Sequence, residues 1–129
     1  MREVYSVYII RKARVISEDI ARRIAKAIDA GKLPREYELL VRNPYVFVPL
    51  VLHAIETRLR GRATLNSKIL KVYYNGYGYK SVIDALVRAG FITKSKQSHN
   101  VGSSKRLYVL KQPFKDLLAM HGFYPYWEK

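Results

Sequence analysis

The chain has 129 residues, of which 49% are hydrophobic and 26% are charged, and it contains no cysteine. These totals are those of one folded domain, and they exclude a disordered chain, a disulfide-bonded fold and a thiolate zinc site. The formal net charge of +14 at pH 7 favours a polyanionic partner, with nucleic acid ahead of an anionic membrane. Residues 58–111 contain 12 Lys and Arg residues against one acidic residue, whereas residues 1–57 contain 10 against seven.

The N-terminus carries β-branched and aromatic residues at positions 4–10, which predict a strand. This apolar run is too short to span a membrane, and no cleavage motif of a secretory signal follows it. We therefore expect no membrane partner and a location in the cytoplasm, or in the host cytoplasm if the protein is viral.

Two helices are predicted to follow this strand and to complete an N-terminal extension over residues 1–48. Residues 17–31 form an amphipathic pattern that begins at Ser17, a suitable N-cap residue, and ends at a glycine. Residues 33–43 predict a shorter helix with Pro34 at its first position.

Three further helices are predicted at the start of the region 49–111. The first either begins near Pro49 or kinks there, because proline is disfavoured deeper inside a helix. The second runs to about Tyr74, and its apolar side is expected to consist of Leu65, Ile69, Val72 and Tyr73. A glycine-containing turn at 75–78 separates it from the third helix, at about 79–89.

A strand, a basic loop and a second strand are predicted after the third helix. The apolar sequences GFIT and LYVL indicate the two strands, and the loop between them, at about 93–106, is rich in Lys, Ser and Asn. The remaining segment, 112–129, is predicted to form a helix opened by Pro113 and an aromatic tail.

The order of elements over residues 49–110 resembles that of winged helix-turn-helix proteins, above all in the stretch SVIDALVRAGFITKSK followed by SSKRLYVL. The resemblance implies an α+β fold with a three-helix core and a β-hairpin wing, here with an N-terminal strand and helix extension and a C-terminal helix. It also implies double-stranded DNA as the partner, with the helix at about 79–89 in the major groove and the wing on the backbone and minor groove. The tyrosine-rich, cysteine-free composition is similar to that of small regulators of hyperthermophilic archaea and of their viruses and plasmids.

The candidate DNA-binding residues lie on this helix and on the wing. On the helix and the turn before it, the outward side chains are Tyr77, Tyr79, Lys80, Ser81, Asp84 and Arg88. Lys80 and Ser81 are the strongest candidates for base or phosphate contacts, the two tyrosines equally suit packing, and Arg88 suits a phosphate or an ion pair with Asp84. The wing supplies charge and neutral donors for phosphate oxygens from Lys94, Lys96, Gln97, Ser98, His99, Asn100, Ser103, Ser104, Lys105 and Arg106.

The sequence gives no indication of catalysis. Carboxylates are scarce in the basic region, the three histidines are far apart, and no phosphate-binding glycine loop occurs. We therefore expect no enzymatic activity, no cofactor and no metal.

A transcription regulator that acts as a homodimer is the function that the resemblance implies. The candidate dimer surfaces are the strand 4–10 and an aromatic C-terminus consisting of Phe114, Leu117, Leu118, Phe123, Tyr124, Tyr126 and Trp127. A structural RNA-binding protein is the alternative, because residues 16–41 and 51–76 are similar to a winged-helix protein of the archaeal and eukaryotic small ribosomal subunit. A viral or plasmid replication or packaging protein is a third interpretation, with the same DNA-binding surface.

Overall fold

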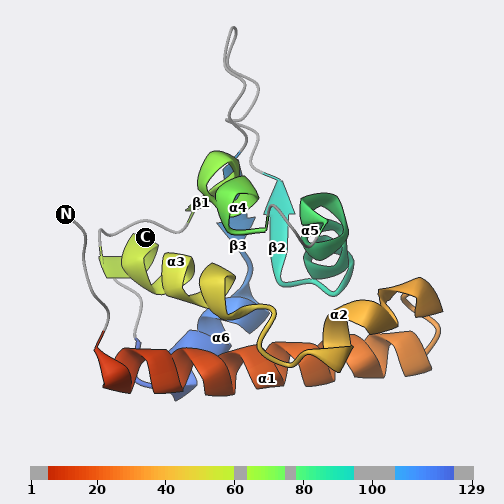
Figure 1. Ribbon diagram of the computed structural model, residues 1–129, viewed down its shortest axis with the longest axis horizontal. Coiled ribbons are helices and arrows are strands. Elements are labelled where there is room, and N and C mark those ends of the chain that lie inside the picture. Colours follow the sequence, from red (N-terminus) through yellow and green to blue (C-terminus); the bar gives the residue numbers. More distant parts are fainter. Residues whose placement is uncertain (1–5, 60–63, 75–77, 95–106, 124–129) are drawn as a thin grey trace, which may run out of the picture.

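The computed structural model describes residues 6–59, 64–74, 78–94 and 107–123 (Figure 1). Within these ranges the chain contains six α-helices, one short 3-10 helix and one three-stranded antiparallel sheet, which is an α+β fold. In chain order the elements are α1 (Val7–Asp29), η1 (Arg35–Tyr37), α2 (Glu38–Arg42), α3 (Val48–Leu59), β1 (Thr64–Asn66), α4 (Ser67–Tyr73), α5 (Tyr79–Arg88), β2 (Ile92–Lys94), β3 (Leu107–Leu110) and α6 (Gln112–Met120).

The predicted N-terminal strand is wrong, because helix α1 already begins at Val7. Ser6 is the N-cap, and its side chain accepts a hydrogen bond from the backbone nitrogen of Ile9 at 3.2 Å. The buried positions recur every three or four residues from Ala13 to Ile28, and the first turn continues this helix from the Ser6 cap despite its β propensity. The fully buried residues at this spacing are Ala13, Ile16, Ile20 and Ile24.

Ser17 lies in the middle of α1 and is not its N-cap, which corrects the second N-terminal prediction. The side chain is buried, and its hydroxyl donates a hydrogen bond to the carbonyl oxygen of Pro44 at 2.7 Å. The Ser17 hydroxyl oxygen also accepts a hydrogen bond from the backbone nitrogen of Phe47 at 3.1 Å. Ser17 therefore fastens α1 to the turn that precedes α3.

The next helices are close to those predicted. Residues 33–43 form η1 and then α2, and Pro34 precedes the first turn in an extended conformation. Helix α3 begins at Val48, so Pro49 lies in its first turn as predicted. Proline is tolerated there because the first N–H groups of a helix have no intrahelical acceptor.

The sheet has the strand order β1–β3–β2, and both pairings are antiparallel. Leu65 of β1 pairs with Tyr108, and Ile92 of β2 pairs with Leu110. Beyond this last pair, the backbone nitrogen of Lys111 donates a hydrogen bond to the carbonyl oxygen of Phe91 at 2.8 Å. At the other end of these strands Lys94 pairs with Tyr108, so the two ends of the segment between β2 and β3 are held side by side. The succession α3–β1–α4–α5–β2–β3 is compatible with a winged-helix-like arrangement.

Helix α4 faces the core with a different side from the one predicted. The chain forms β1 before α4 begins at Ser67, and this start directs Leu70 and Tyr74 inward. The Tyr74 hydroxyl donates a hydrogen bond to the carbonyl oxygen of Val46 at 2.8 Å, which fixes this orientation. The side chains expected to be buried are instead exposed by 39% at Ile69, 75% at Val72 and 41% at Tyr73.

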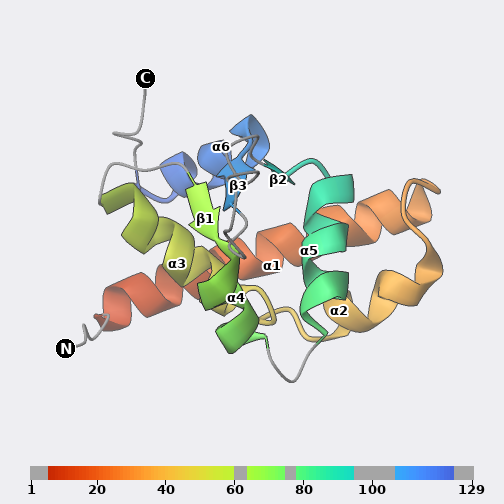
Figure 2. The ribbon, with the colours of Figure 1, turned by 90° about the horizontal axis from the view of Figure 1, so that it is seen from above.

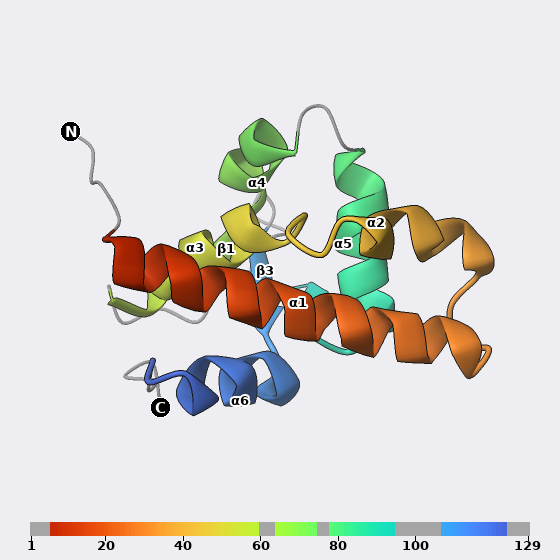
Figure 3. The same cartoon turned by 60° about the horizontal axis from the view of Figure 1, so that its bottom comes forward.

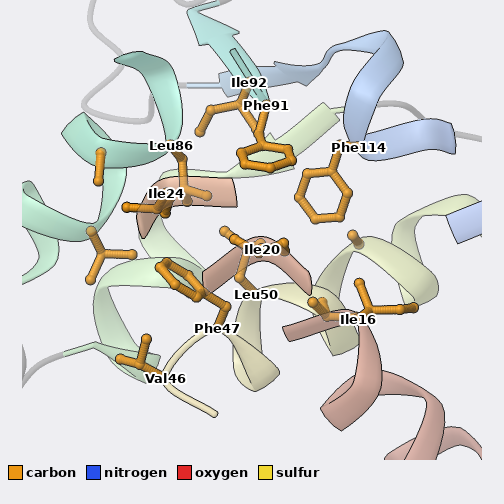
Figure 4. Packing of buried hydrophobic residues seen from close by; sticks show 14 of the residues in the cluster. Ile16, Ile20, Ile24, Val46, Phe47, Leu50, Leu86, Phe91, Ile92 and Phe114 are labelled. Atoms are coloured by element: carbon orange, nitrogen blue, oxygen red, sulfur yellow. The ribbon is translucent and has the colours of Figure 1, made fainter. Parts of the chain in front are cut away.

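A single core cluster contains residues from all the α-helices and from all three strands. Helix α1 runs along one side of the molecule and packs against α3 and α2 on one flank and α6 on the other (Figure 3). Figure 4 shows Ile20 of α1 among Phe47, Leu86, Phe91 and Phe114, which come from four other parts of the chain.

Most of the described aromatic C-terminus belongs to this core, which corrects one expected dimer surface. Phe114, Leu117 and Leu118 on α6 are fully buried, and Phe123 is 7% exposed. These side chains are therefore not available to a second copy of the chain. Tyr124, Tyr126 and Trp127 lie outside the described residues.

Candidate nucleic-acid interface

A surface hollow of about 740 Å³ lies where α4, α5, β2 and β3 meet. Figure 2 shows α4 and α5 on either side of the sheet, at the end from which the segment between β2 and β3 departs. Three exposed lysines from three different elements line the hollow: Lys71 on α4, Lys80 on α5 and Lys94 on β2. Convergent cations on a concave surface are suited to holding an anion.

Local sequence signals set the position of α5 beside this hollow. Gly78 precedes the helix at a φ of 78°, a left-handed conformation that glycine adopts without strain. Within α5, Val82, Ala85 and Leu86 are fully buried and anchor the inner side. Gly90, at a φ of 86°, ends the helical path. The opposite side of the helix is consequently turned away from the core.

The predicted residues of α5 fall on this outward side. Lys80, Ser81 and Arg88 are exposed, and Lys80, Ser81 and Asp84 line the hollow. Tyr79 also lines it, but this ring is half-buried against the core and lies 5.6 Å from Lys71 Nζ. Packing is therefore the role that the geometry favours for Tyr79, and the cation–π contact holds the start of α5 near α4.

Asp84 is already engaged by two neighbours. The Tyr37 hydroxyl donates a hydrogen bond to Asp84 Oδ2, and Arg88 Nε lies 3.2 Å from the same oxygen. The pairing with Arg88 is one of the two roles that the sequence predicted for that arginine. The hydrogen bond to Asp84, together with burial, raises the pKa of Tyr37 above its ordinary value. Asp84 is thus less free to accept from a base than its exposed position in the sequence pattern suggests.

Tyr37 is the residue of this region that sequence reasoning missed. It lies at the end of η1, is 8% exposed and lines the hollow beside Asp84. The sequence shows it only as an aromatic residue in an apolar segment, and nothing local connects it to a position 47 residues away.

The other predicted residues divide into two groups. Lys94 lies at the edge of the hollow, but Tyr77 and the wing candidates beyond Lys94 lie outside the described residues. Of two further cations near the start of this region, Lys68 is exposed, whereas Arg58 is only 7% exposed and stacks 5.9 Å from the Phe123 ring. Arg58 therefore supports the fold at the C-terminal side and is not placed to bind a phosphate.

Features of other site classes are few in the described ranges. No group of three or more His, Asp or Glu side chains there is arranged to hold a metal ion. The histidine of α3, His53, is buried and its Nε2 accepts a hydrogen bond from the backbone nitrogen of Asn66 at 3.4 Å. None of the helices described combines the length and apolar character needed to cross a membrane.

Comparison of the chain with models of protein families, with curated proteins and with solved structures finds no match. The function of this chain therefore has to be inferred from its own geometry and charge.

Proposed function

We propose that the protein binds double-stranded DNA through a winged-helix arrangement and acts as a transcription regulator. In this proposal α5 enters the major groove, and the segment between β2 and β3 acts as a wing on the backbone and minor groove. Lys80 and Ser81 contact base edges or phosphates, and Lys71 and Lys94 hold the backbone that crosses the hollow.

The observation that carries this proposal is the convergence of Lys71, Lys80 and Lys94 on one hollow. These lysines form no ion pair within the described part of the chain, so a phosphate group would not have to displace a carboxylate. The surrounding region, residues 58–111, has one acidic residue against 12 basic ones. Lysines of such a surface replace cations that are condensed on a DNA phosphate backbone, and the release of these cations favours binding.

A selection from a random pool of duplex DNA tests the proposal. We expect an enriched consensus sequence, and we expect the affinity of fluorescein-labelled duplexes, followed by anisotropy, to fall steeply as salt increases. Absence of duplex binding at about 50 mM salt would overturn the proposal. Binding without a consensus would overturn sequence-specific regulation, and preference for a matched duplex RNA would favour the structural RNA-binding alternative.

The homodimer that accompanies this function is tested separately. Val7 and Tyr8, in the first turn of α1, are 66% and 60% exposed, and they are the described remainder of the predicted dimer surfaces. Light scattering at about 50 μM protein should give twice the mass of the chain. A monomer would contradict a model in which two copies bind a palindromic site.

A further inference from the structure

Tyr37 connects the N-terminal part of the chain to the exposed end of α5. Its hydroxyl hydrogen-bonds to Asp84 Oδ2, and Arg88 Nε lies 3.2 Å from that same oxygen. The three side chains thus form a continuous chain of polar contacts from η1 to the last turn of α5. Helix α2, which directly follows η1 in the chain, lies beside α5 in Figure 3.

Packing fixes the start of this chain of contacts. Tyr37 belongs to the core cluster, together with Leu33 and Leu40 on either side of it in the sequence. Its backbone nitrogen also donates a hydrogen bond to the carbonyl oxygen of Pro34 at 3.2 Å. A hydroxyl carried by a packed ring has little side-chain freedom left to lose, so it is an effective anchor for a more exposed group.

The groups that Tyr37 anchors are more exposed. The side chains of Asp84 and Arg88 are 43% and 50% exposed, and an isolated pair of this kind is held only weakly in water. The contact uses Nε of Arg88, so both terminal nitrogen atoms of the guanidinium can still donate to a ligand. Two parallel N–H donors match two oxygens of one phosphate group.

We propose that Tyr37 is a positioning residue, which acts through Asp84 to hold the Arg88 guanidinium ready to bind a backbone phosphate of duplex DNA. This inference rests on the proposed function and gives a role in DNA binding to a residue that lies outside α5. Pre-orientation reduces the side-chain entropy that Arg88 loses on binding. Asp84 then serves as the link between the two residues and reads no base.

A double-mutant cycle tests whether Tyr37 acts through Arg88. The probe is a fluorescein-labelled duplex of about 30 base pairs with random sequence. We expect Tyr37→Phe to weaken its binding about three- to tenfold, as for loss of one supporting hydrogen bond. In the Arg88→Ala background, the same change should alter affinity by less than about twofold, because the group it positions is gone.

Tyr45→Phe is the matched control for this experiment. The carboxylate of Glu18 raises the pKa of Tyr45, and the Tyr45 ring lies 5.5 Å from the Arg14 guanidinium, but Tyr45 is not part of the hollow. We expect this variant to bind the duplex with unchanged affinity in both backgrounds.

The possible outcomes separate the inference from the proposed function. Equal losses from Tyr37→Phe in the two backgrounds would overturn the inference alone, as would an Arg88→Ala protein that binds like the wild type. A wild-type protein that binds no duplex overturns the proposed function before any variant is compared.

NMR of the DNA-free protein tests the chain of contacts itself. The Nε–H signal of Arg88 should shift in Tyr37→Phe and stay in place in Tyr45→Phe. A signal that is unchanged in both variants would contradict the positioning role, whatever the DNA measurements give.

Discussion

Helices α1 and α5 both carry basic side chains on their outer faces, but the acidic side chains near them have different partners. On α1, Asp19 pairs with Arg22, and the carboxylate of Glu18 raises the pKa of Tyr45. On α5, the one acidic residue, Asp84, forms an ion pair with Arg88 and accepts a hydrogen bond from Tyr37. The lysines around α5 are consequently left without a carboxylate partner in the described ranges.

Under the proposed function, this difference separates the hollow from the basic face of α1. The cations of α1 are spread along a convex helix of 23 residues and are interleaved with three acidic residues. Those of the hollow come from α4, α5 and β2 and point to one place. Fold topology, which brings separate elements together, is what concentrates the charge.

Core substitutions should give the largest change in the free energy of unfolding. They test whether α1 and α5 belong to one packed unit. Ile20 of α1 and Leu86 of α5 are both fully buried, and they lie in the same cluster (Figure 4). We expect Ile20→Ala and Leu86→Ala each to lower the free energy of unfolding by about 2–5 kcal/mol, measured by urea denaturation. A cost well below about 1 kcal/mol for Leu86→Ala would mean that α5 is loosely attached.

Serine substitutions give a smaller and more local contrast. Ser17→Ala on α1 leaves the Pro44 carbonyl and the Phe47 N–H without their hydrogen-bond partner, so we expect a loss of stability of about 1–3 kcal/mol. Ser81→Ala on α5 removes an exposed hydroxyl and should change stability by less than about 0.5 kcal/mol. Thermal unfolding followed by circular dichroism compares the two, and equal losses would contradict the assigned roles.

Matched charge removals on the two faces leave the core intact and give the most direct readout. Replacing Lys71, Lys80 and Lys94 with Ala should weaken binding to a random duplex at least about tenfold and reduce the salt slope by about 0.9 per lysine. Replacing Arg22, Arg23 and Lys26 of α1 with Ala removes the same charge and should leave the slope nearly unchanged. A similar fall in slope for both triple variants would remove the distinction between the faces.

Local signals were sufficient to predict the elements around the hollow. Helix α5 was predicted at about 79–89 and spans Tyr79–Arg88, because glycines mark both of its ends. The exposure of Lys80 and Ser81 followed from the same pattern. These features depend on residues that are close together in the sequence.

Features that depend on distant packing were not predictable in the same way. The first turn of α1 has strand-forming residues, and it is helical as the continuation of a helix whose later turns are packed in the core. Ser17 is a good N-cap residue by type, yet its partners at Pro44 and Phe47 arise from tertiary structure. The bond between Tyr37 and Asp84 spans 47 positions and leaves no local pattern.

The closed base of the β2–β3 connection has a consequence for how this surface can change. The Lys94–Tyr108 pair joins the two ends of the connection, and the Ile92–Leu110 pair and the hydrogen bond from Lys111 to Phe91 hold the same two strands together at the core. All of these contacts are made by residues outside the segment 95–106. Exchange of this segment for one of another length or charge should therefore leave the scaffold intact, which makes the position a natural insertion point for evolution and a grafting site for engineering.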